Sequence, residues 1–380
     1  MISINRERLA RIFVELCEID SPSGRERQVC SYLTTLFERM GADLIVEDDS
    51  AAATGSDCGN LLVRFFGAGP GEPVFFNCHM DTVQPGVGVK VRRRDDIFAS
   101  AGDTVLGGDD KSGIAVLIEA ITAIKEQGVS HAPVEFLFTT CEEVGLRGAK
   151  AFDPATLHAR MGYALDSAGV ARLVIGAPAA NRFRVTVTGV AAHAGLHPEK
   201  GVNAIQVAAR AVAGLRLGRL DSDSTANVGL VTGGSATNIV PETAVVEGEV
   251  RSHQAEKLRR YTDEVKAAFE ESARETREQA GREDGLPLAR FEIFQDYPVM
   301  RLSREEKVVA RIARAAAALG QGMEYLVAGG GSDANIFNGR GVATAILATG
   351  MTNVHSTDET IALGDMVTTA ELVVSLLVTG

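Results

Sequence analysis

The chain has 380 residues, of which 45% are hydrophobic, and it carries a formal net charge of −12 at pH 7. This apolar content argues against a disordered chain, and the length favours two domains over one. The negative charge argues against binding to nucleic acid through a phosphate-neutralising surface, because that mode needs clustered Lys and Arg.

We expect a cytoplasmic protein without a membrane partner. No stretch holds 18 apolar residues in a row, and the opening residues lack an apolar core followed by a small-residue cleavage site. The five cysteines form no Cys-x-x-Cys pair, so free thiols are expected rather than a disulfide framework.

The first part of the chain alternates between helical and extended patterns. Helical periodicity covers residues 5–17 and 25–40, with Ser23 as the expected N-cap of the second helix. Apolar runs of strand length follow at 60–66, 73–80, 134–140 and 161–166, and helical spacing of Ile and Leu marks the segment 111–128. This alternation indicates an α/β fold with a doubly wound, mostly parallel sheet, in which ligands bind outside the carboxyl ends of the strands.

The middle of the chain has a different order of elements. Residues 181–297 read as strand, helix, strand, strand, helix and strand, which is the β-α-β-β-α-β order of a ferredoxin-like unit. A segment of about 115 residues can form its own core, so we predict an inserted domain at 181–297 and a first domain made of 1–180 and 298–380. The chain returns to the first domain with a helix near 303–319, a strand at 343–349 and a helix from about 364.

Polar side chains follow the predicted strands of the first domain, at the ends where a ligand is expected. They are His79, Asp81, Asp109, Asp110, Glu142, Glu143, Asp166 and His355. Carboxylates gathered at one edge repel one another, and a bound cation removes that cost. Two histidines with several carboxylates suit zinc, cobalt or manganese, and a carboxylate that bridges two ions would make a paired site. Asp81 stands two positions after His79, where it can accept the second imidazole N–H.

Six segments of the chain form an ordered set: NCHMDTV (77–83), GGDDKSG (107–113), CEEVGLRGAK (141–150), VAAHAGLHPEKGVNAI (190–205), GGSATNIVPE (233–242) and NVHSTDE (353–359). Together they resemble the co-catalytic zinc peptidases of the M20 family, and most of all its peptidase T-like, tripeptidase branch. The resemblance covers nearly the whole chain. It implies a metal-binding catalytic domain interrupted by a small lid domain, which is also a candidate interface for a homodimer.

The resemblance also implies roles for the residues of the first domain. Two divalent ions are expected, most of all Zn²⁺, with Co²⁺ or Mn²⁺ as alternatives. One ion would bind His79 and Asp166, the other would bind Glu143 and His355, and Asp109 would bridge the two. Glu142 would be the general base for a metal-activated water, Asp81 would orient a metal ligand, and the Asp109–Asp110 peptide bond would be cis.

Three residues of the lid complete the implied site. His193 would reach the reacting carbonyl oxygen, while Asn238 and Arg251 would hold the far end of the substrate. Each also has a structural interpretation: His193 as a turn residue, Asn238 as a backbone cap and Arg251 as the partner of a lid carboxylate.

The expected function is therefore that of an enzyme, a dinuclear zinc aminopeptidase that hydrolyses the N-terminal peptide bond of short peptides, tripeptides foremost. Two alternatives stay open. One is an amidohydrolase on the same scaffold that cleaves N-acyl amino acids, and the other is a non-catalytic metal-dependent binding protein. A requirement for a free α-amine would separate the first two functions.

Overall fold

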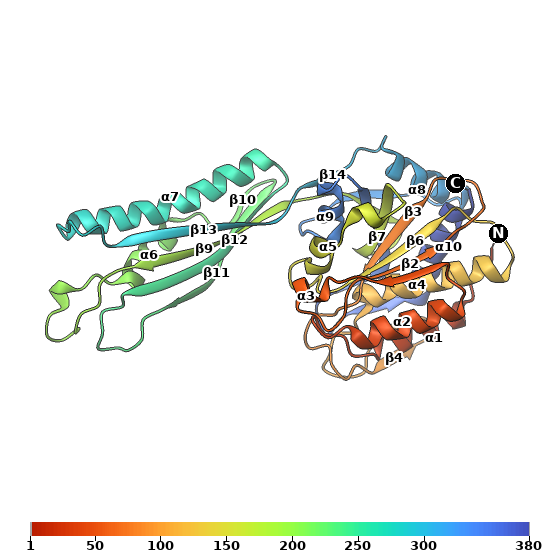
Figure 1. Cartoon of the computed structure of the whole chain (residues 1–380), viewed down its shortest axis with the longest axis horizontal. Coiled ribbons are helices and arrows are strands. Elements are labelled where there is room, and N and C mark those ends of the chain that lie inside the picture. Colours follow the sequence, from red (N-terminus) through yellow and green to blue (C-terminus); the bar gives the residue numbers. More distant parts are fainter. Residues whose placement is uncertain (1, 380) are drawn as a thin grey trace. The chain divides into compact units, whose positions relative to one another are not determined.

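The structure, a computed structural model, describes residues 2–379. These residues form two units, which are residues 2–176 with 300–379, and Ala177–Val299 (Figure 1). The chain thus leaves the first unit, builds the second from one continuous segment, and returns. Within the described residues, none of the helices combines the length and the apolar character needed to span a membrane.

A mixed sheet lies at the centre of the first unit. Its strands follow the order β1-β2-β6-β3-β7-β16-β8-β14, and β15 pairs with β8. The four central strands are parallel to one another: β6 (Val134–Thr139), β3 (Val74–His79), β7 (Met161–Ala168) and β16 (Ala343–Met351). The expected doubly wound α/β fold is confirmed, with antiparallel pairs on both flanks of this parallel centre.

The flanking strands complete the sheet. They are β1 (Leu44–Glu47), β2 (Leu61–Phe65), β8 (Arg172–Ala177), β14 (Met300–Arg301) and β15 (Glu324–Val327). β2 is antiparallel to β6, and β8 is antiparallel to β16. Of these five flanking strands, only β2 was expected from the sequence, as the apolar run 60–66. The direction of each strand depends on which neighbour it pairs with.

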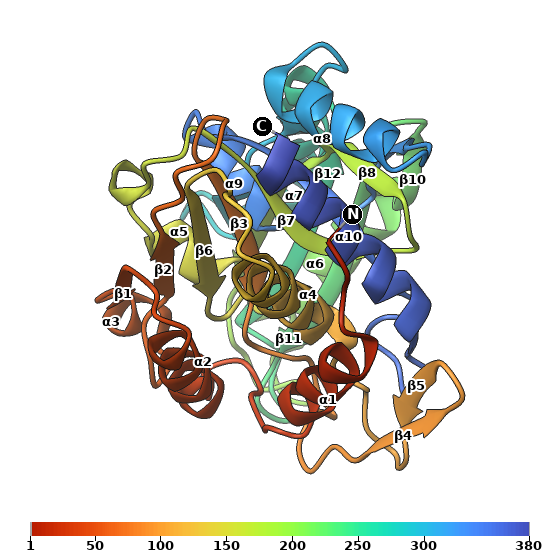
Figure 2. The same ribbon diagram turned by 90° about the vertical axis from the view of Figure 1, so that its right-hand side faces the viewer.

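Helices cover the sheet and explain why its central strands read as continuous apolar runs. The long helix α4 (Gly108–Glu126) packs on β3, β7 and β16, and α1 (Arg6–Cys17) and α10 (Leu363–Thr379) pack on α4 (Figure 2). α8 (Lys307–Ala318) and α9 (Asp333–Gly339) contact β7 and β16, and α2 (Arg27–Arg39) contacts β1 and β2. Two short helices, α3 (Ala51–Thr54) and α5 (Arg147–Ala151), contact each other.

A small three-stranded sheet accompanies the large one in the first unit. It has the order β17-β5-β4 and consists of β17 (Thr360–Ala362), β5 (Ile97–Ser100) and β4 (Val91–Arg94). β17 begins nine residues after the end of β16. The loop between these two strands carries the NVHSTDE segment.

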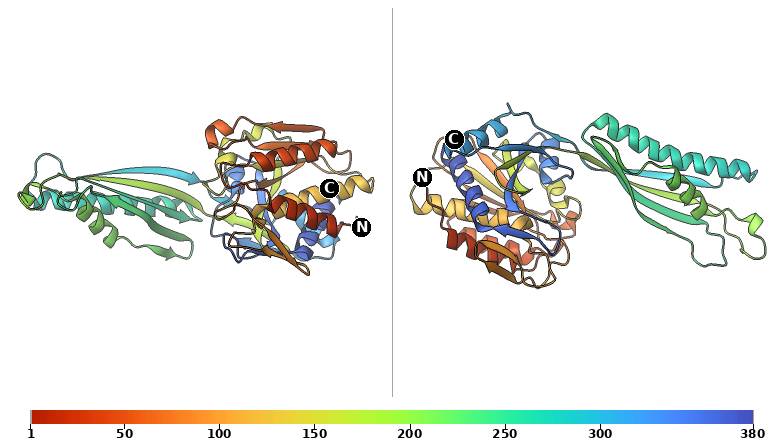
Figure 3. Two further views of the ribbon diagram at one scale, coloured as in Figure 1. Left: turned by 90° about the horizontal axis from the view of Figure 1, so that it is seen from below. Right: turned by 180° about the vertical axis from the view of Figure 1, so that it is seen from behind.

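The second unit is an antiparallel sheet with two helices (Figure 3). Its elements are β9 (Ala179–Thr188), α6 (Ala204–Gly214), β10 (Gly218–Asp221), β11 (Ser224–Gly233), β12 (Thr243–Ser252), α7 (Ala255–Gln279) and β13 (Leu288–Tyr297). The strand order is β10-β11-β12-β9-β13, in which the four long strands have the ferredoxin-like arrangement. Alternate residues Phe183, Val185 and Val187 of β9 are buried in the core that α6 and α7 share, whereas Arg184 is exposed and pairs with Glu247.

Candidate metal centre

The candidate residues of the first unit gather at the carboxyl ends of the central strands. His79 ends β3, Glu142 and Glu143 follow β6, and Asp166 lies in the second half of β7. Asp109 stands at the start of α4, and His355 lies in the loop between β16 and β17. Because parallel strands present their carboxyl ends at one edge, segments far apart in the sequence meet there.

These side chains form groups with the spacing of metal ligands. In one group, ligand atoms of His79, Asp109 and Asp166 all lie within 4.8 Å of one another. A second group with the same spacing contains Asp109, Glu143 and His355, so Asp109 belongs to both. His79 also forms a third such group with Glu142 and Glu143.

Asp109 lies between the two imidazoles. Its Oδ1 is 3.0 Å from Nε2 of His79, and its Oδ2 is 3.1 Å from Nε2 of His355. Nε2 of His355 is also 3.0 Å from Oε1 of Glu143. Each carboxylate oxygen of Asp109 therefore faces a different imidazole nitrogen, which is the arrangement that a bridging ligand needs.

In the metal-free protein, protons on the imidazoles take the place of cations. Burial by itself would lower the pKa of His79, but hydrogen bonds with Asp109 and Asp81 raise it well above the usual 6.5. Hydrogen bonds with Asp109 and Glu143 raise the pKa of His355 to about 10. Imidazole and carboxylate donors that hold protons so strongly fit a divalent cation such as Zn²⁺, which would replace those protons.

The carboxylates of the centre differ in their pKa. Burial acts to raise the pKa of Asp109, but hydrogen bonds from His355 and His79 outweigh it and hold this pKa below its usual value. Burial raises the pKa of both Asp166 and Glu142 well above the ordinary values, and neighbouring carboxylates add to the effect. The centre thus has an excess of buried acidic groups that added positive charge would stabilise.

Asp81 connects several parts of the centre. Its Oδ1 accepts the main-chain N–H of Glu142 at 3.0 Å, and its Oδ2 accepts the main-chain N–H of Glu143 at 3.2 Å. Nδ1 of His79 is 2.9 Å from the main-chain carbonyl oxygen of Asp81 and 3.5 Å from its carboxylate. The shorter contact of the imidazole is therefore with the carbonyl, while the carboxylate orients the backbone of the two glutamates.

Two contributions to the site were missed by the sequence analysis. Ser23 does not cap α2, which begins at Arg27 without a side-chain cap; its Oγ donates to Oδ2 of Asp81 at 2.6 Å. The expectation for Ser23 was therefore wrong, because a buried carboxylate from a distant loop takes its hydroxyl. Glu359 is buried, and its carboxylate accepts the N–H groups of Gly107 and Asp109. The only signal for Glu359 was its place at the end of the NVHSTDE segment.

The Asp109–Asp110 peptide bond is cis, as the resemblance implied. Asp110 makes a different contact from Asp109: its Oδ2 accepts the main-chain N–H of His79 at 3.3 Å. The two adjacent aspartates thus contact different sides of the His79 residue, one its ring and the other its backbone.

The three remaining candidate residues belong to the second unit. His193 is exposed, and its Nδ1 accepts the N–H of Gly195 at 3.1 Å. A neutral imidazole whose Nδ1 accepts a hydrogen bond carries its proton on Nε2, so Nε2 of the exposed His193 is an N–H donor. Asn238 is exposed, and Arg251 pairs with Glu249 at 2.9 Å, a lid carboxylate.

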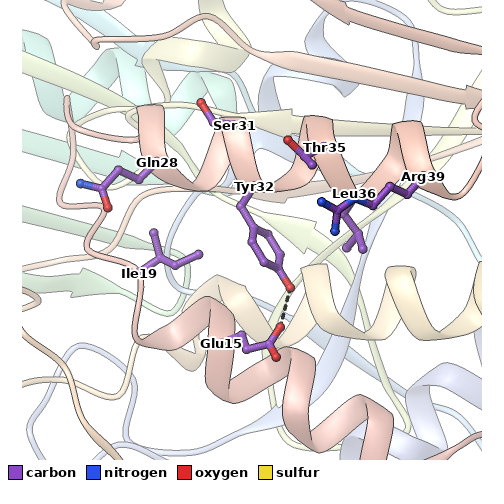
Figure 4. Close-up of a pocket in the computed structure, with 8 residues that line it drawn as sticks. All are labelled: Glu15, Ile19, Gln28, Ser31, Tyr32, Thr35, Leu36 and Arg39. Carbon is purple, nitrogen blue, oxygen red and sulfur yellow. Dashed lines mark hydrogen bonds between the residues drawn. The ribbon is translucent and has the colours of Figure 1, made fainter.

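A groove elsewhere on the first unit contains none of the candidate residues. It has a volume of about 610 Å³ and lies between α1 and α2, where Tyr32 donates a hydrogen bond of 2.8 Å to Glu15 (Figure 4). Its other lining residues are Ile19, Gln28, Ser31, Thr35, Leu36 and Arg39. None of its lining residues belongs to the ligand groups at the strand ends, so the groove is separate from the metal centre.

Comparison with known proteins gives two family matches and close structural relatives. Residues 175–277 match the peptidase dimerisation domain of M20 peptidases, and residues 60–210 match peptidase family M28. The structure of aminopeptidase PepT from Bacillus cereus ATCC 10987 is 41% identical in sequence with a TM-score of 0.87, and the match covers 98% of each chain.

Two further solved structures extend the comparison. A tripeptidase from Staphylococcus aureus subsp. aureus Mu50 is 34% identical with a TM-score of 0.90, over 99% of this chain and 98% of that one. YxeP from Bacillus subtilis, described as a dinuclear metal binding peptidase from the M20 family, is 16% identical with a TM-score of 0.70 over 98% of each chain. At that identity the third match supports the fold alone.

Proposed function

This chain belongs to the M20 family of peptidases, in its peptidase T-like branch, and we propose that it is a two-metal aminopeptidase that removes the N-terminal residue of short peptides, tripeptides foremost. The names of the two relatives support this choice, since one is an aminopeptidase and the other a tripeptidase. Both align with this chain over nearly its full length at 41% and 34% identity.

The observation that carries the proposal is the position of Asp109 between two imidazoles, at 3.0 and 3.1 Å. We propose that His79 and Asp166 hold one ion, that Glu143 and His355 hold the other, and that Asp109 is shared. The donor set suits Zn²⁺, with Co²⁺ or Mn²⁺ as alternatives. When bound, two such ions would supply Lewis acidity to polarise the scissile carbonyl and activate a water.

Glu142 is the proposed general base. It is buried, its pKa is raised above the ordinary value chiefly by burial, and its main-chain N–H is held by Asp81. Glu142 would take one proton from the attacking water as the new C–O bond forms. It would then give that proton to the amine nitrogen as the C–N bond breaks. A raised pKa favours this transfer, because the same carboxylate must take up the proton and then release it.

The second unit supplies the proposed substrate contacts. The Nε2–H of His193 is a suitable donor to the carbonyl oxygen, on which negative charge develops during attack. Arg251 and Asn238 are proposed to hold the far end of the peptide, where a guanidinium suits the C-terminal carboxylate. For this role a substrate carboxylate must compete with Glu249 for Arg251.

A homodimer through the second unit is also part of the proposal. The match to the peptidase dimerisation domain falls on this unit, and β11 and β13 carry exposed apolar side chains, including Leu230, Val231 and Phe294. Sedimentation at several protein concentrations would test it, because a dimer should give twice the monomer mass.

A peptide-length panel tests the function. The zinc-loaded protein would be given alanine peptides of two to five residues, each with a free and an acetylated N-terminus, and the released alanine and acetate would both be measured. We expect the highest kcat/KM for the free tripeptide and no hydrolysis of the acetylated peptides. Equal rates on free and acetylated peptides would favour the N-acyl amidohydrolase instead. No hydrolysis of any peptide would favour a binding protein.

A further inference from the structure

The loop between β16 and β17 carries a second residue that turns toward the metal centre, four positions after His355. The side chain of Glu359 is buried, with only 2% of the residue exposed. Its Oε2 accepts the main-chain N–H of Gly107 at 2.9 Å, and its Oε1 accepts the main-chain N–H of Asp109 at 3.0 Å. One carboxylate thus holds the backbone on both sides of Gly108.

The backbone at this place is shaped for the carboxylate. Gly107 has φ +75°, in the left-handed region that favours glycine. A Cβ added at Gly108 would lie 2.9 Å from Oε1 of Glu359, closer than a carbon and an oxygen normally approach. The two glycines therefore let the carboxylate lie directly against the segment that ends in Asp109.

The loop itself is a closed turn. Thr352 and Thr360 exchange main-chain hydrogen bonds of 2.9 and 3.1 Å, and the N–H of Glu359 donates to the carbonyl of Ser356 at 3.2 Å. His355 lies inside this turn with φ +62°. Because hydrogen bonds close the turn, the contacts that fix Glu359 also restrict the backbone of His355.

We propose that Glu359 is a positioning residue that fixes His355 relative to Asp109. It thereby sets the affinity for the second ion, whose proposed ligands are Asp109, Glu143 and His355. The inference rests on the proposed two-metal function. Without the carboxylate of Glu359, only the ligands themselves would keep Nε2 of His355 at 3.1 Å from Oδ2 of Asp109. His79 and Asp166 lie on β3 and β7, so their places do not depend on this loop.

Replacement of Glu359 by Gln tests the role. Gln keeps one acceptor oxygen, but its NH₂ group then faces the second N–H donor, so one of the two hydrogen bonds is lost. Groups that orient metal ligands typically change metal affinity 10–100-fold when mutated. For Glu359→Gln we expect the second ion to bind about 10–100-fold more weakly. The first ion should lose less affinity, because of its ligands only Asp109 contacts Glu359.

Glu135→Gln is the matched control. Glu135 is also a buried carboxylate that accepts two main-chain N–H groups, those of His158 at 3.2 Å and Ala159 at 2.7 Å, and it pairs with Arg64. It is the second residue of β6 and belongs to none of the candidate ligand groups found among the described residues. We expect Glu135→Gln to lower the midpoint of urea unfolding and to leave both metal affinities unchanged.

Gly108→Ala provides a second variant that keeps the carboxylate. The new Cβ would press on Oε1, and the end of a flexible side chain is the part that moves, so Glu359 should leave its two N–H partners. We expect the same selective loss of the second ion as in Glu359→Gln. This variant decides the matter if Glu359→Gln does not fold.

Stepwise titration of the metal-free proteins with Co²⁺, followed by absorbance and by metal analysis, gives the number of ions and both binding constants. Selective weakening of the second ion in the variants supports the positioning role. Unchanged affinities, or equal weakening of both ions, would overturn it while the proposed function stands. An unchanged protein that binds fewer than two ions would instead overturn the two-metal function.

Discussion

Metal binding at this centre should release protons from the ligands. One of these protons comes from His355, and the pH dependence of the metal affinity measures its release. In the metal-free protein, hydrogen bonds to Asp109 and Glu143 raise the pKa of His355 to about 10. A metal ion can bind this imidazole only after its proton has left. Below the raised pKa, each competing proton makes the apparent association constant rise about tenfold per pH unit.

The expected magnitude follows from that pKa. Between about pH 6 and 9, His355 contributes about three decades to the apparent affinity of the second ion, since its pKa of about 10 lies above this range. His79, whose pKa is also raised, adds a similar dependence to the first ion. In His355→Asn, the slope for the second ion should fall by about one decade per pH unit, because the amide has no proton to release.

The same pKa has a consequence for folding stability. A histidine whose pKa is higher in the folded state than the ordinary 6.5 stabilises the metal-free protein fully below that value. This contribution is lost as the pH rises through about 10. Because the side chain of His355 is half exposed, solvent screening makes the effect small.

Competition with a chromophoric chelator, at fixed ionic strength and at several pH values, would measure the affinities. Calorimetry in two buffers of different ionisation enthalpy would count the protons. His158→Asn is the matched control, since His158 is exposed and belongs to none of the ligand groups found among the described residues. A flat pH profile, or equal slopes for His355→Asn and the unchanged protein, would refute the reasoning.

Three further substitutions, together with one control substitution, test the base and the core. Glu142→Gln should keep both ions in metal analysis and lower kcat about 10²–10⁴-fold, and an unchanged kcat would remove Glu142 as the base. Gly162→Ala would place a Cβ 2.2 Å from the ring and 2.5 Å from the carbonyl oxygen of Phe75. The free energy of unfolding in urea should therefore fall by about 1–3 kcal/mol or more. Gly364→Ala is the control and should show no such loss, because the space around its Cβ is open. Ile121→Ala in α4 removes a fully buried side chain and should cost about 2–5 kcal/mol in the same measurement, and a loss below 1 kcal/mol would show that the core closes around the missing atoms.

Hydrophobic period and element order were enough to predict the fold class. The Ile and Leu spacing of α4 and the apolar runs of β3, β6 and β7 follow from burial against a sheet or between helices, and burial leaves a local trace in the sequence. The order of elements between β9 and β13 likewise indicates the ferredoxin-like unit. Strand direction left no such trace, because the antiparallel pairing of β2 with β6 depends on which neighbour is adjacent in space.

For the site, the residue types and their places at strand ends were readable from the chain, as was the family. The hydrogen bonds among them were not. Ser23 binds Asp81, and Glu359 binds the backbone of Gly107 and Asp109, across chain separations of 58 and about 250 residues. A local pattern reports only what a residue does within its own helix or strand. Which distant donor a buried carboxylate meets is decided when the sheet and its loops close around it, because burial then forces each polar group to find a partner within reach.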